Sequence, residues 1–336
     1  MGLFVESLRK SFGTHVALRD VSFDVPRGAF FCVVGPSGCG KSTLLRAIAG
    51  LETPDAGQIT LDGALVFGGG TNVPPEERQV GVVFQSYALW PHLSVARNVA
   101  FPYEATGTPR GEALRLADQH LETVALSDFA QRRPDALSGG QRQRVALARC
   151  LAGQTRTILM DEPLANLDPH LRHSMEGELR AFHDRSGVTT LFITHDQREA
   201  MALADVMAVM EDGQFLQFGT PQDIYDRPAS AAVARFIGRG ALLEGDVEGA
   251  YARVLGQDVP VTGAGSATIF VRPQNIVADA EGVPVTLRSV LYRGGHWEVT
   301  GTAEGSEAEL MFDLPAPARP GDVVPVRLTG GWVLPA

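Results

Sequence analysis

The chain has 336 residues, 44% of them hydrophobic and 20% charged, a composition typical of a soluble globular protein with room for about two domains. Its formal net charge of −10 argues against general nucleic-acid binding, because phosphate backbones require a basic surface. Three cysteines without a CxxC pair predict no disulfide or zinc framework, and we expect neither a signal peptide nor a run of about 18 apolar residues that would span a membrane.

Strand and helix patterns alternate over most of the chain. Strands are predicted at 3–8, 16–25, 30–34, 79–85, 157–161 and 190–194, and helices at 41–51, 110–126, 141–152, 169–186 and 198–204. A hairpin around Asp212-Gly213 follows them. Strands that alternate with helices predict an α/β fold with a largely parallel central sheet.

The character of the sequence changes near Gly238-Arg239-Gly240. Beyond this point helical patterns vanish, and short Val, Leu and Thr segments alternate with Gly, Pro and Asp. Such spacing is typical of a small all-β, barrel-like domain. We therefore predict two domains, 1–237 and 238–336.

The motif GPSGCGKST (35–43) lies between the strand predicted at 30–34 and the following helix, and it matches the phosphate-binding pattern G-x-x-x-x-G-K-[ST] in full. Its glycines let backbone N–H groups wrap a phosphate, and the helix N-terminus adds its positive dipole end. Lys41, one of only two lysines, is expected to bridge the β- and γ-phosphates. The residues predicted to hold ATP here are Gly35, Pro36, Ser37, Gly38, Cys39, Gly40, Lys41, Ser42 and Thr43.

The segment TILMDEP (157–163) is an apolar strand that ends in two acids. Ligands of an open α/β sheet bind at the carboxyl ends of its strands. Asp161 and Ser42 suit Mg²⁺ coordination, and Glu162 suits polarising an attacking water. Without the phosphate loop, a strand ending in a solvated acidic turn would explain the segment equally well.

The segment LSGGQ (137–141) is a second glycine-rich stretch ahead of a predicted helix, and it has no lysine. A helix cap explains part of it, since Ser138 is a preferred N-cap residue. In chain order, Phe12, GPSGCGKST, Gln85, LSGGQ, TILMDEP, LANLD (164–168) and His195 resemble the motifs of the ATPase subunits of ATP-binding-cassette (ABC) transporters. The resemblance extends over essentially the whole chain.

The resemblance implies an ABC-type P-loop NTPase core, a helical subdomain at about 86–136 that receives the membrane subunits, and a C-terminal regulatory β-domain of the OB or TOBE type. Within that core, Phe12 would stack on adenine, Gln85 would link Mg²⁺ and the lytic water to the transporter, and His195 would contact the γ-phosphate. Each has a plainer alternative: a core Phe, a surface Gln and a structural His. Trp90 and Leu93 would line the groove for the membrane subunits or belong to the core.

The resemblance also gives LSGGQ a role. In this family two subunits pack head to tail, so the motif of one closes over the nucleotide of the other, and Asp168 crosses the dimer. Ala165 stands where the family often has Ser. The residues expected to act on the partner's nucleotide are Ser138, Gly139, Gly140, Gln141 and Asp168.

The expected cofactors are ATP and Mg²⁺. The expected partners are a second copy of the chain, two transmembrane permease subunits and an extracytoplasmic substrate-binding protein, with the chain at the cytoplasmic face of the cell (inner) membrane and no nucleic acid bound. RFIGRGALLEGDV (235–247) and ATIFVRPQNIVA (267–278), in which Gln274 replaces a common Glu, most resemble ferric-iron importer ATPases. Polyamine, sulfate, phosphonate and sugar importers remain alternatives, as do a soluble ABC-type ATPase and a ligand-sensing module.

Overall fold

The computed structural model describes residues 2–165, 167–263, 265 and 267–335. The chain divides into two compact units, Met1–Pro221 and Gln222–Ala336. This division falls earlier than the predicted domain boundary at 237/238, because α8 (Ala231–Phe236) packs its alanines against Phe270 and Leu334. The extents 1–237 and 238–336 stay a prediction for the functional domains. No helix among the described residues is long and apolar enough to cross a membrane.

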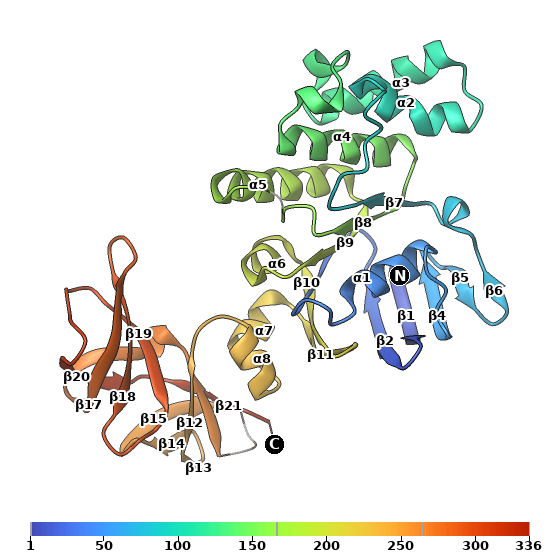
Figure 1. The fold of residues 1–336 in the computed structure, drawn as a ribbon. Helices are drawn as coiled ribbons and strands as arrows, with labels where there is room; N and C mark the ends of the chain where they lie inside the picture. Colours follow the sequence, from blue (N-terminus) through green and yellow to red (C-terminus); the bar gives the residue numbers. More distant parts are fainter. Residues whose placement is uncertain (1, 166, 264, 266, 336) are drawn as a thin grey trace. The chain divides into compact units, whose positions relative to one another are not determined.

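A six-stranded sheet forms the centre of the first unit (Figure 1). Its order is β11-β10-β3-β9-β8-β7, and every pair except β10–β11 is parallel. The strands are β3 (Phe30–Val34), β7 (Val80–Val83), β8 (Thr157–Asp161), β9 (Thr189–Thr194), β10 (Val206–Glu211) and β11 (Gln214–Gly219). β3 and β9 are buried along their whole length, as their continuous apolar sequences predict.

A second, antiparallel sheet has the order β2-β1-β4-β5-β6. Its strands are β1 (Leu3–Phe12), β2 (His15–Val25), β4 (Ala56–Leu61), β5 (Ala64–Gly68) and β6 (Thr71–Asn72), followed by the 3₁₀ turn η1 (Pro75–Glu77). Helix α1 (Lys41–Ala49) shares one hydrophobic core with both sheets, through Leu44, Leu45 and Ile48. This core fixes the loop that precedes α1 beside the end of β3.

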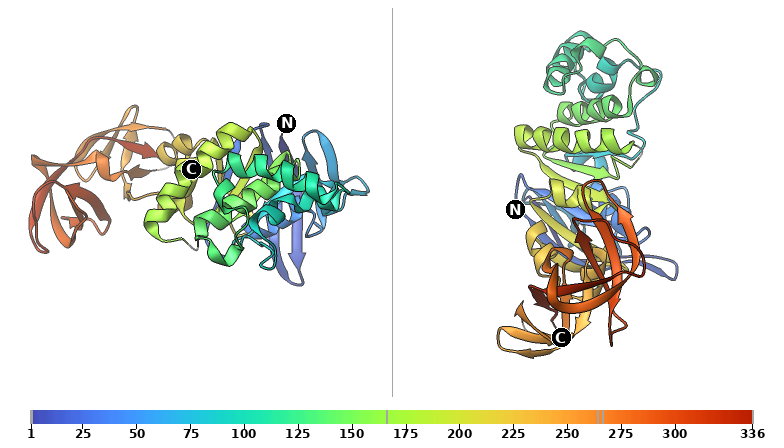
Figure 2. Two further views of the ribbon diagram at one scale, coloured as in Figure 1. Left: turned by 90° about the horizontal axis from the view of Figure 1, so that it is seen from above. Right: turned by 90° about the vertical axis from the view of Figure 1, so that its left-hand side faces the viewer.

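Helices α2 (Val95–Ala105), α3 (Arg110–Thr123) and α4 (Gly139–Ala152) pack on one another. The short turns η2 (Ser127–Phe129) and η3 (Pro134–Ala136) connect α3 to α4. Helix α5 (Pro169–Ser186) lies beside α4 on the side facing the central sheet, and α6 (Gln197–Leu203) follows β9 (Figures 1 and 2). The sequence patterns missed α2 and placed the start of α4 two residues too late.

The second unit contains two sheets, in the orders β12-β16-β21-β15-β14-β13 and β19-β18-β17-β20, around a common hydrophobic core. Its all-β character agrees with the prediction, apart from α7 (Pro221–Asp226), α8 and the turn η4 (Pro273–Asn275). The strands are β12 (Ala241–Glu244), β13 (Asp246–Glu248), β14 (Tyr251–Val254), β15 (Gln257–Thr262), β16 (Thr268–Val271), β17 (Ile276–Tyr292), β18 (Trp297–Ala303), β19 (Glu309–Leu314), β20 (Val323–Leu328) and β21 (Gly331–Val333).

Candidate functional site

The loop between β3 and α1 needs glycine at two positions for steric reasons. A Cβ atom on Gly35 would lie 2.1 Å from the carbonyl oxygen of Met210, and one on Gly40 would lie 2.3 Å from that of Ala17. Gly40 also has a φ of 108°, a conformation that residues with side chains rarely adopt. The motif therefore shapes a tight loop whose backbone stays accessible.

Lys41 begins α1 and folds back over this loop. Its side chain is buried, and its ammonium group donates hydrogen bonds to the carbonyl oxygens of Gly35 (2.8 Å) and Pro36 (2.9 Å). Gly40, the N-cap residue, offers no side-chain acceptor to the first turn of α1. The leading N–H groups of the helix are thus available to an anion, together with the positive end of the helix dipole.

A cavity of about 230 Å³ opens in front of this loop. Its wall combines eight predicted site residues with two that the sequence patterns did not single out, His15 and Ala17; the eight are Phe12, Ser37, Gly38, Gly40, Lys41, Ser42, Thr43 and Glu162. Phe12 is 47% exposed, so it is not a core residue. Cys39 turns away into the hydrophobic core, and burial raises the pKa of its thiol.

Ser42 and Asp161 meet at the carboxyl end of β8. The Ser42 hydroxyl donates a hydrogen bond to Asp161 Oδ1 at 2.9 Å. Two converging oxygens next to a phosphate loop fit Mg²⁺, which takes one or two protein ligands and completes its shell with phosphate and water oxygens. Within the described residues, no group of three or more His, Cys, Asp or Glu side chains could hold a metal by itself. The two oxygens could therefore hold the cation in combination with phosphate and water oxygens.

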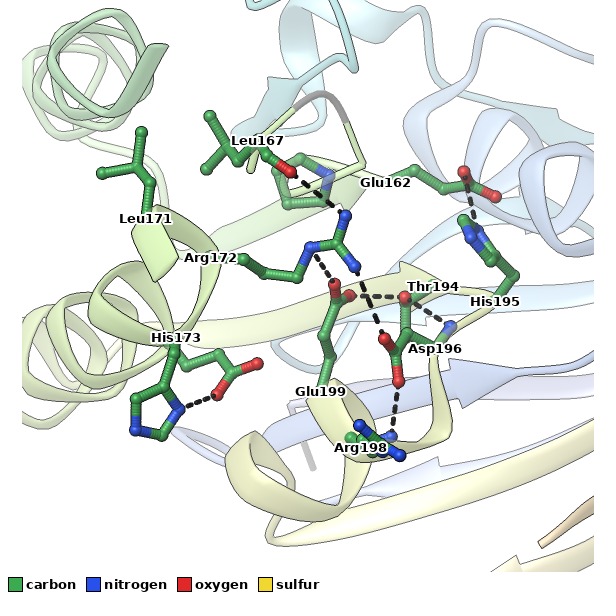
Figure 3. Close-up of polar contacts among 12 residues, drawn as sticks. Glu162, Leu167, Leu171, Arg172, His173, Thr194, His195, Asp196, Arg198 and Glu199 are labelled. Carbon is green, nitrogen blue, oxygen red and sulfur yellow. Dashed lines mark hydrogen bonds and ion pairs between the residues drawn. The ribbon is translucent and has the colours of Figure 1, made fainter. Parts of the chain in front are cut away.

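Glu162 and His195 lie at the ends of neighbouring parallel strands, where Asp161 of β8 is paired with Ile193 of β9. The Glu162 carboxylate is 3.1 Å from Nδ1 of His195 (Figure 3). Glu162 has a φ of 46°, an uncommon conformation outside glycine, and its amide donates to the carbonyl oxygen of Ile193 at 3.0 Å. The fold thus holds a carboxylate and an imidazole together at the edge of the cavity.

Gln85 is exposed two residues after β7. Val83 pairs with Met160, so Gln85 follows the strand next to the one that carries Asp161. Among the described residues, Gln85 is not in the wall of the cavity in front of Lys41. Gln85 thus follows a strand next to β8, and its predicted role toward Mg²⁺ stays a prediction.

The sequence patterns missed Tyr87, which lies in the same loop. Tyr87 is buried, has a φ of 63°, and donates a hydrogen bond from its hydroxyl to the carbonyl oxygen of Pro163 at 3.4 Å. Burial raises the pKa of this phenol. Arg149 of α4 donates to the carbonyl oxygens of Tyr87 and Ala88, at 3.1 and 2.7 Å. The sequence carries no signal for this role, because the burial of Tyr87 and its contact with Pro163 arise from tertiary packing.

The two residues predicted for the groove differ. Leu93 is 8% exposed and belongs to the core. Trp90 is half-buried; its ring centre lies 4.2 Å from that of Phe101 and 4.9 Å from the guanidinium carbon of Arg149. Of the two predicted residues, Trp90 therefore contributes to an aromatic surface, together with Phe101, which is 40% exposed.

LSGGQ forms the N-terminus of α4 as a capping box. Ser138 Oγ accepts from the amide of Gln141 at 3.3 Å, and Gln141 Oε1 accepts from the amide of Ser138 at 2.9 Å. A Cβ on Gly139 would lie 2.6 Å from Leu167 Cδ2, and one on Gly140 would lie 2.8 Å from the sulfur of Met175. The helix-cap interpretation thus holds, and the glycines additionally permit close packing.

Asp168 caps α5 by accepting from the amide of Leu171 at 3.0 Å, and its side chain is exposed. Asn166, inside LANLD, lies outside the described residues. None of the five residues predicted to act on a partner's nucleotide is among the described residues that line the cavity at Lys41; they are Ser138, Gly139, Gly140, Gln141 and Asp168. One chain therefore keeps its two glycine-rich helix starts apart.

Comparisons with known proteins find related chains. The profile of the ABC transporter family matches residues 18–165. A sulfate/thiosulfate import ATP-binding protein of Caulobacter vibrioides is 41% identical over 317 residues, 92% of each chain. A Fe(3+) ions import ATP-binding protein of Rhizobium etli is 42% identical over 305 residues, 87% of this chain and 85% of the relative.

A solved structure also matches, the dimeric post-hydrolysis state of an ATP-binding cassette bound to ADP and Pi. It superposes with a TM-score of 0.56 and 29% sequence identity, and it covers 65% of this chain and 98% of its own. The match, together with the observed sheets, confirms the predicted fold class of an α/β nucleotide-binding core followed by a C-terminal all-β domain.

Proposed function

The chain belongs to the ABC transporter family as an ATP-binding subunit of the importer type, and we propose that two copies of it hydrolyse ATP between them to drive uptake of ferric iron through membrane permease subunits. The observation that carries the proposal is the meeting, at one cavity edge, of the Lys41 loop, the Ser42–Asp161 pair and the Glu162–His195 pair. The loop and the two pairs serve different parts of phosphoryl transfer, namely phosphate binding, Mg²⁺ binding and orientation of the attacking water.

The loop and Lys41 bind the phosphates. Backbone N–H groups from Gly38 to Thr43 face an anion at the start of α1, and the adenine ring stacks on the exposed ring of Phe12. Lys41 exchanges its bonds to the Gly35 and Pro36 carbonyls for the β- and γ-phosphate oxygens. Ser42 and Asp161, with Gln85 beside them, would hold Mg²⁺, which supplies positive charge to the phosphate oxygens when bound.

Glu162 orients the water that attacks the γ-phosphorus. Its carboxylate accepts a hydrogen bond from that water and takes up a proton as the new P–O bond forms and the bond to the ADP oxygen breaks. His195 holds the carboxylate from 3.1 Å and faces the γ-phosphate from the end of β9. The unusual φ of Glu162 fixes the direction in which its side chain leaves the strand.

The second copy completes the site. Ser138, the amides of Gly139 and Gly140, and Gln141 cover the γ-phosphate held by the partner, and Asp168 reaches across the interface. The capping box uses only the amide of Gln141 in the first turn of α4, so the two glycine amides can still point at an anion. A two-fold symmetric pair of chains then contains two such sites. Support comes from the dimeric cassette bound to ADP and Pi.

Glu162→Gln tests the catalytic part of the proposal. The amide cannot take up the proton, so steady-state phosphate release should fall by about 10²–10⁴-fold. ATP binding should persist, and ATP should now hold the chain as a stable dimer, measured by light scattering after gel filtration. A Glu162→Gln variant that releases phosphate as fast as the wild type would contradict the role of Glu162.

Ferric iron is proposed as cargo because the segments 235–247 and 267–278 resemble those of iron importer ATPases. The Fe(3+) and sulfate/thiosulfate relatives are about equally similar, at 42% and 41% identity, so sulfate is the second candidate. The chain itself would work at the cytoplasmic face of the membrane, where permease subunits and an extracytoplasmic binding protein handle the cargo.

Uptake of labelled Fe³⁺ and labelled sulfate, in cells that carry either the wild-type chain or Lys41→Ala, separates these candidates. We expect Lys41→Ala to abolish Fe³⁺ uptake and leave sulfate uptake unchanged. Loss of sulfate uptake alone would reassign the cargo without affecting the ATPase mechanism.

A further inference from the structure

Arg172, one turn into α5, contacts two segments that the proposed mechanism uses separately (Figure 3). One of its terminal nitrogens donates to the carbonyl oxygen of Leu167 at 3.2 Å, immediately before Asp168. Its other terminal nitrogen lies 3.6 Å from Asp196 Oδ2, and its Nε lies 3.6 Å from Glu199 Oε1. One guanidinium group therefore joins residues 164–168 to residues 194–199.

Residues 194–199 form a hydrogen-bond network of their own, which encloses His195 in sequence. The amide of Asp196 donates to the Thr194 hydroxyl at 3.0 Å, and that hydroxyl donates to Glu199 Oε2 at 2.5 Å. Asp196 also accepts from the amide of Arg198 at 2.8 Å, which starts α6. A displacement of Glu199 or Asp196 would thus be passed to the backbone on both sides of His195.

The ion pairs of Arg172 are partly shielded from water. The Glu199 side chain is 4% exposed and that of Arg172 is 28% exposed. Burial is the main cause that raises the pKa of the Glu199 carboxyl, so its ionised form depends on nearby donors. Loss of the guanidinium would remove the positive charge that lies 3.6 Å from this buried carboxyl, whose hydrogen bond comes from the Thr194 hydroxyl.

We propose that Arg172 is a positioning residue that couples the segment ending in Asp168 to the segment carrying His195. Asp168, which reaches the partner's nucleotide, and His195, which faces the chain's own nucleotide, then move together. The catalytic consequence rests on the proposed function, whereas the mechanical link is a property of the folded chain alone. A planar guanidinium suits this position better than an ammonium, since one carbonyl acceptor and two carboxylates surround it in different directions.

The same helix provides a matched control. Arg180 lies two turns further along α5 and is 35% exposed. It donates to the carbonyl oxygen of Leu203 at 2.9 Å and pairs with Asp205 at 2.8 Å and Asp184 at 3.0 Å. It has similar exposure and similar partners, yet its contacts lie outside 164–168 and 194–199.

The experiment compares Arg172→Met, Arg172→Lys and Arg180→Met in the full chain. Hydrogen–deuterium exchange of the nucleotide-free protein measures the coupling of the two segments directly. Steady-state ATPase kinetics measure the effect of this coupling on hydrolysis. Arg172→Met should speed exchange in both segments and lower kcat about tenfold or more, with KM for ATP within about twofold, because the Lys41 loop is untouched. Arg172→Lys should fall between wild type and Arg172→Met, and Arg180→Met should leave exchange in both segments and kcat unchanged.

Unchanged exchange in either segment of Arg172→Met would overturn the proposal, even if kcat fell. Equal effects of Arg180→Met would overturn it as well, because general loosening of α5 would then explain the data. If the wild type hydrolysed no ATP, the proposed function would fail while the exchange comparison still decided the coupling. Melting temperatures of all variants exclude global unfolding, and Arg172→Lys keeps the test decisive if Arg172→Met does not fold.

Discussion

Two helices in the first unit start at glycine-rich loops, and they use glycine for different reasons. Before α1, Gly38 and Gly40 have φ values of 82° and 108°, a conformation that favours glycine, and at Gly40 the backbone carbonyl of Ala17 also leaves no room for a side chain. Before α4, Gly139 and Gly140 have no positive φ, and glycine there makes room for the ends of the Leu167 and Met175 side chains. The same residue type thus shapes a loop in one place and permits close packing in the other.

The two helix starts also differ in how their N–H groups are satisfied. Gly40 gives α1 no side-chain cap. The ammonium group of Lys41 donates to two loop carbonyls, and a bound nucleotide would replace these acceptors. Ser138 and Gln141 give α4 a complete capping box. The first N–H groups of α1 are therefore left without a side-chain cap, whereas the α4 start is capped by side chains of the chain itself.

Among the variants that test this comparison, Gly40→Ala should have the largest effect on ATP binding and on stability. The new methyl group would meet the backbone carbonyl of Ala17 at 2.3 Å in a conformation that alanine avoids. We expect a loss of about 2–3 kcal/mol at the loop, which corresponds to roughly 30–150-fold weaker ATP binding. Titration calorimetry with ATP and urea unfolding measure the two consequences.

Gly38→Ala is the matched control, because its φ is also positive but no heavy atom lies within 4 Å of the new methyl. It should cost only the left-handed strain of about 1–2 kcal/mol. Equal losses in the two variants would mean that strain alone, without the collision at Ala17, decides the loop.

Ser138→Arg should have the next largest effect. It should impair dimerisation of the two chains and their ATP hydrolysis, without impairing ATP binding by one chain. Replacing the cap costs about 1 kcal/mol of stability, as Ser138→Ala would, and the arginine additionally fills the surface that faces the partner's γ-phosphate. ATP affinity of the monomer should stay within about threefold of wild type. Hydrolysis and ATP-dependent dimerisation, measured by phosphate release and light scattering, should be lost in Ser138→Arg and largely kept in Ser138→Ala.

A Ser138→Arg monomer that hydrolysed ATP at the full rate would contradict the division of the site between two chains. Loss of ATP binding by the monomer would contradict the separation of the two helix starts within one chain.

The position and shape of the α1 loop could be predicted from sequence because they are determined locally. A glycine, a lysine and a hydroxyl residue at fixed spacing after a strand determine the loop by themselves. The alternation of strands and helices likewise predicted the central sheet, since buried strands such as β3 and β9 are continuous apolar runs. Helix α2 was missed because Pro102 lies inside it and aromatic residues precede it.

Contacts between distant segments could not be predicted in the same way. Arg172 reads as one more charge on an amphipathic helix, and only the fold brings it to Asp196 and Glu199. Tyr87 likewise becomes informative only when its hydroxyl is seen beside Pro163. Such links depend on tertiary packing that has no sequence period, so they are visible only in the structure.

Gly139→Ala should have the smallest effect on stability among the main variants, and it tests the difference between the two helix starts directly. The new methyl would approach the end of the Leu167 side chain, which can rotate, and alanine favours a helix over glycine by up to about 1 kcal/mol. The free energy of unfolding should therefore change by less than about 1 kcal/mol. Hydrolysis should fall a few-fold, because Leu167 carries the carbonyl that Arg172 holds and precedes Asp168.

Gly140→Ala is the control, since its methyl meets the flexible Met175, away from 164–168. It should leave hydrolysis within about twofold of wild type, measured by phosphate release beside the urea unfolding of both variants. If Gly139→Ala destabilised the chain as strongly as Gly40→Ala, the start of α4 would be a strained loop like the start of α1. A small stability change together with slower hydrolysis would instead place the role of Gly139 in the packing of α4 against the segment that ends in Asp168.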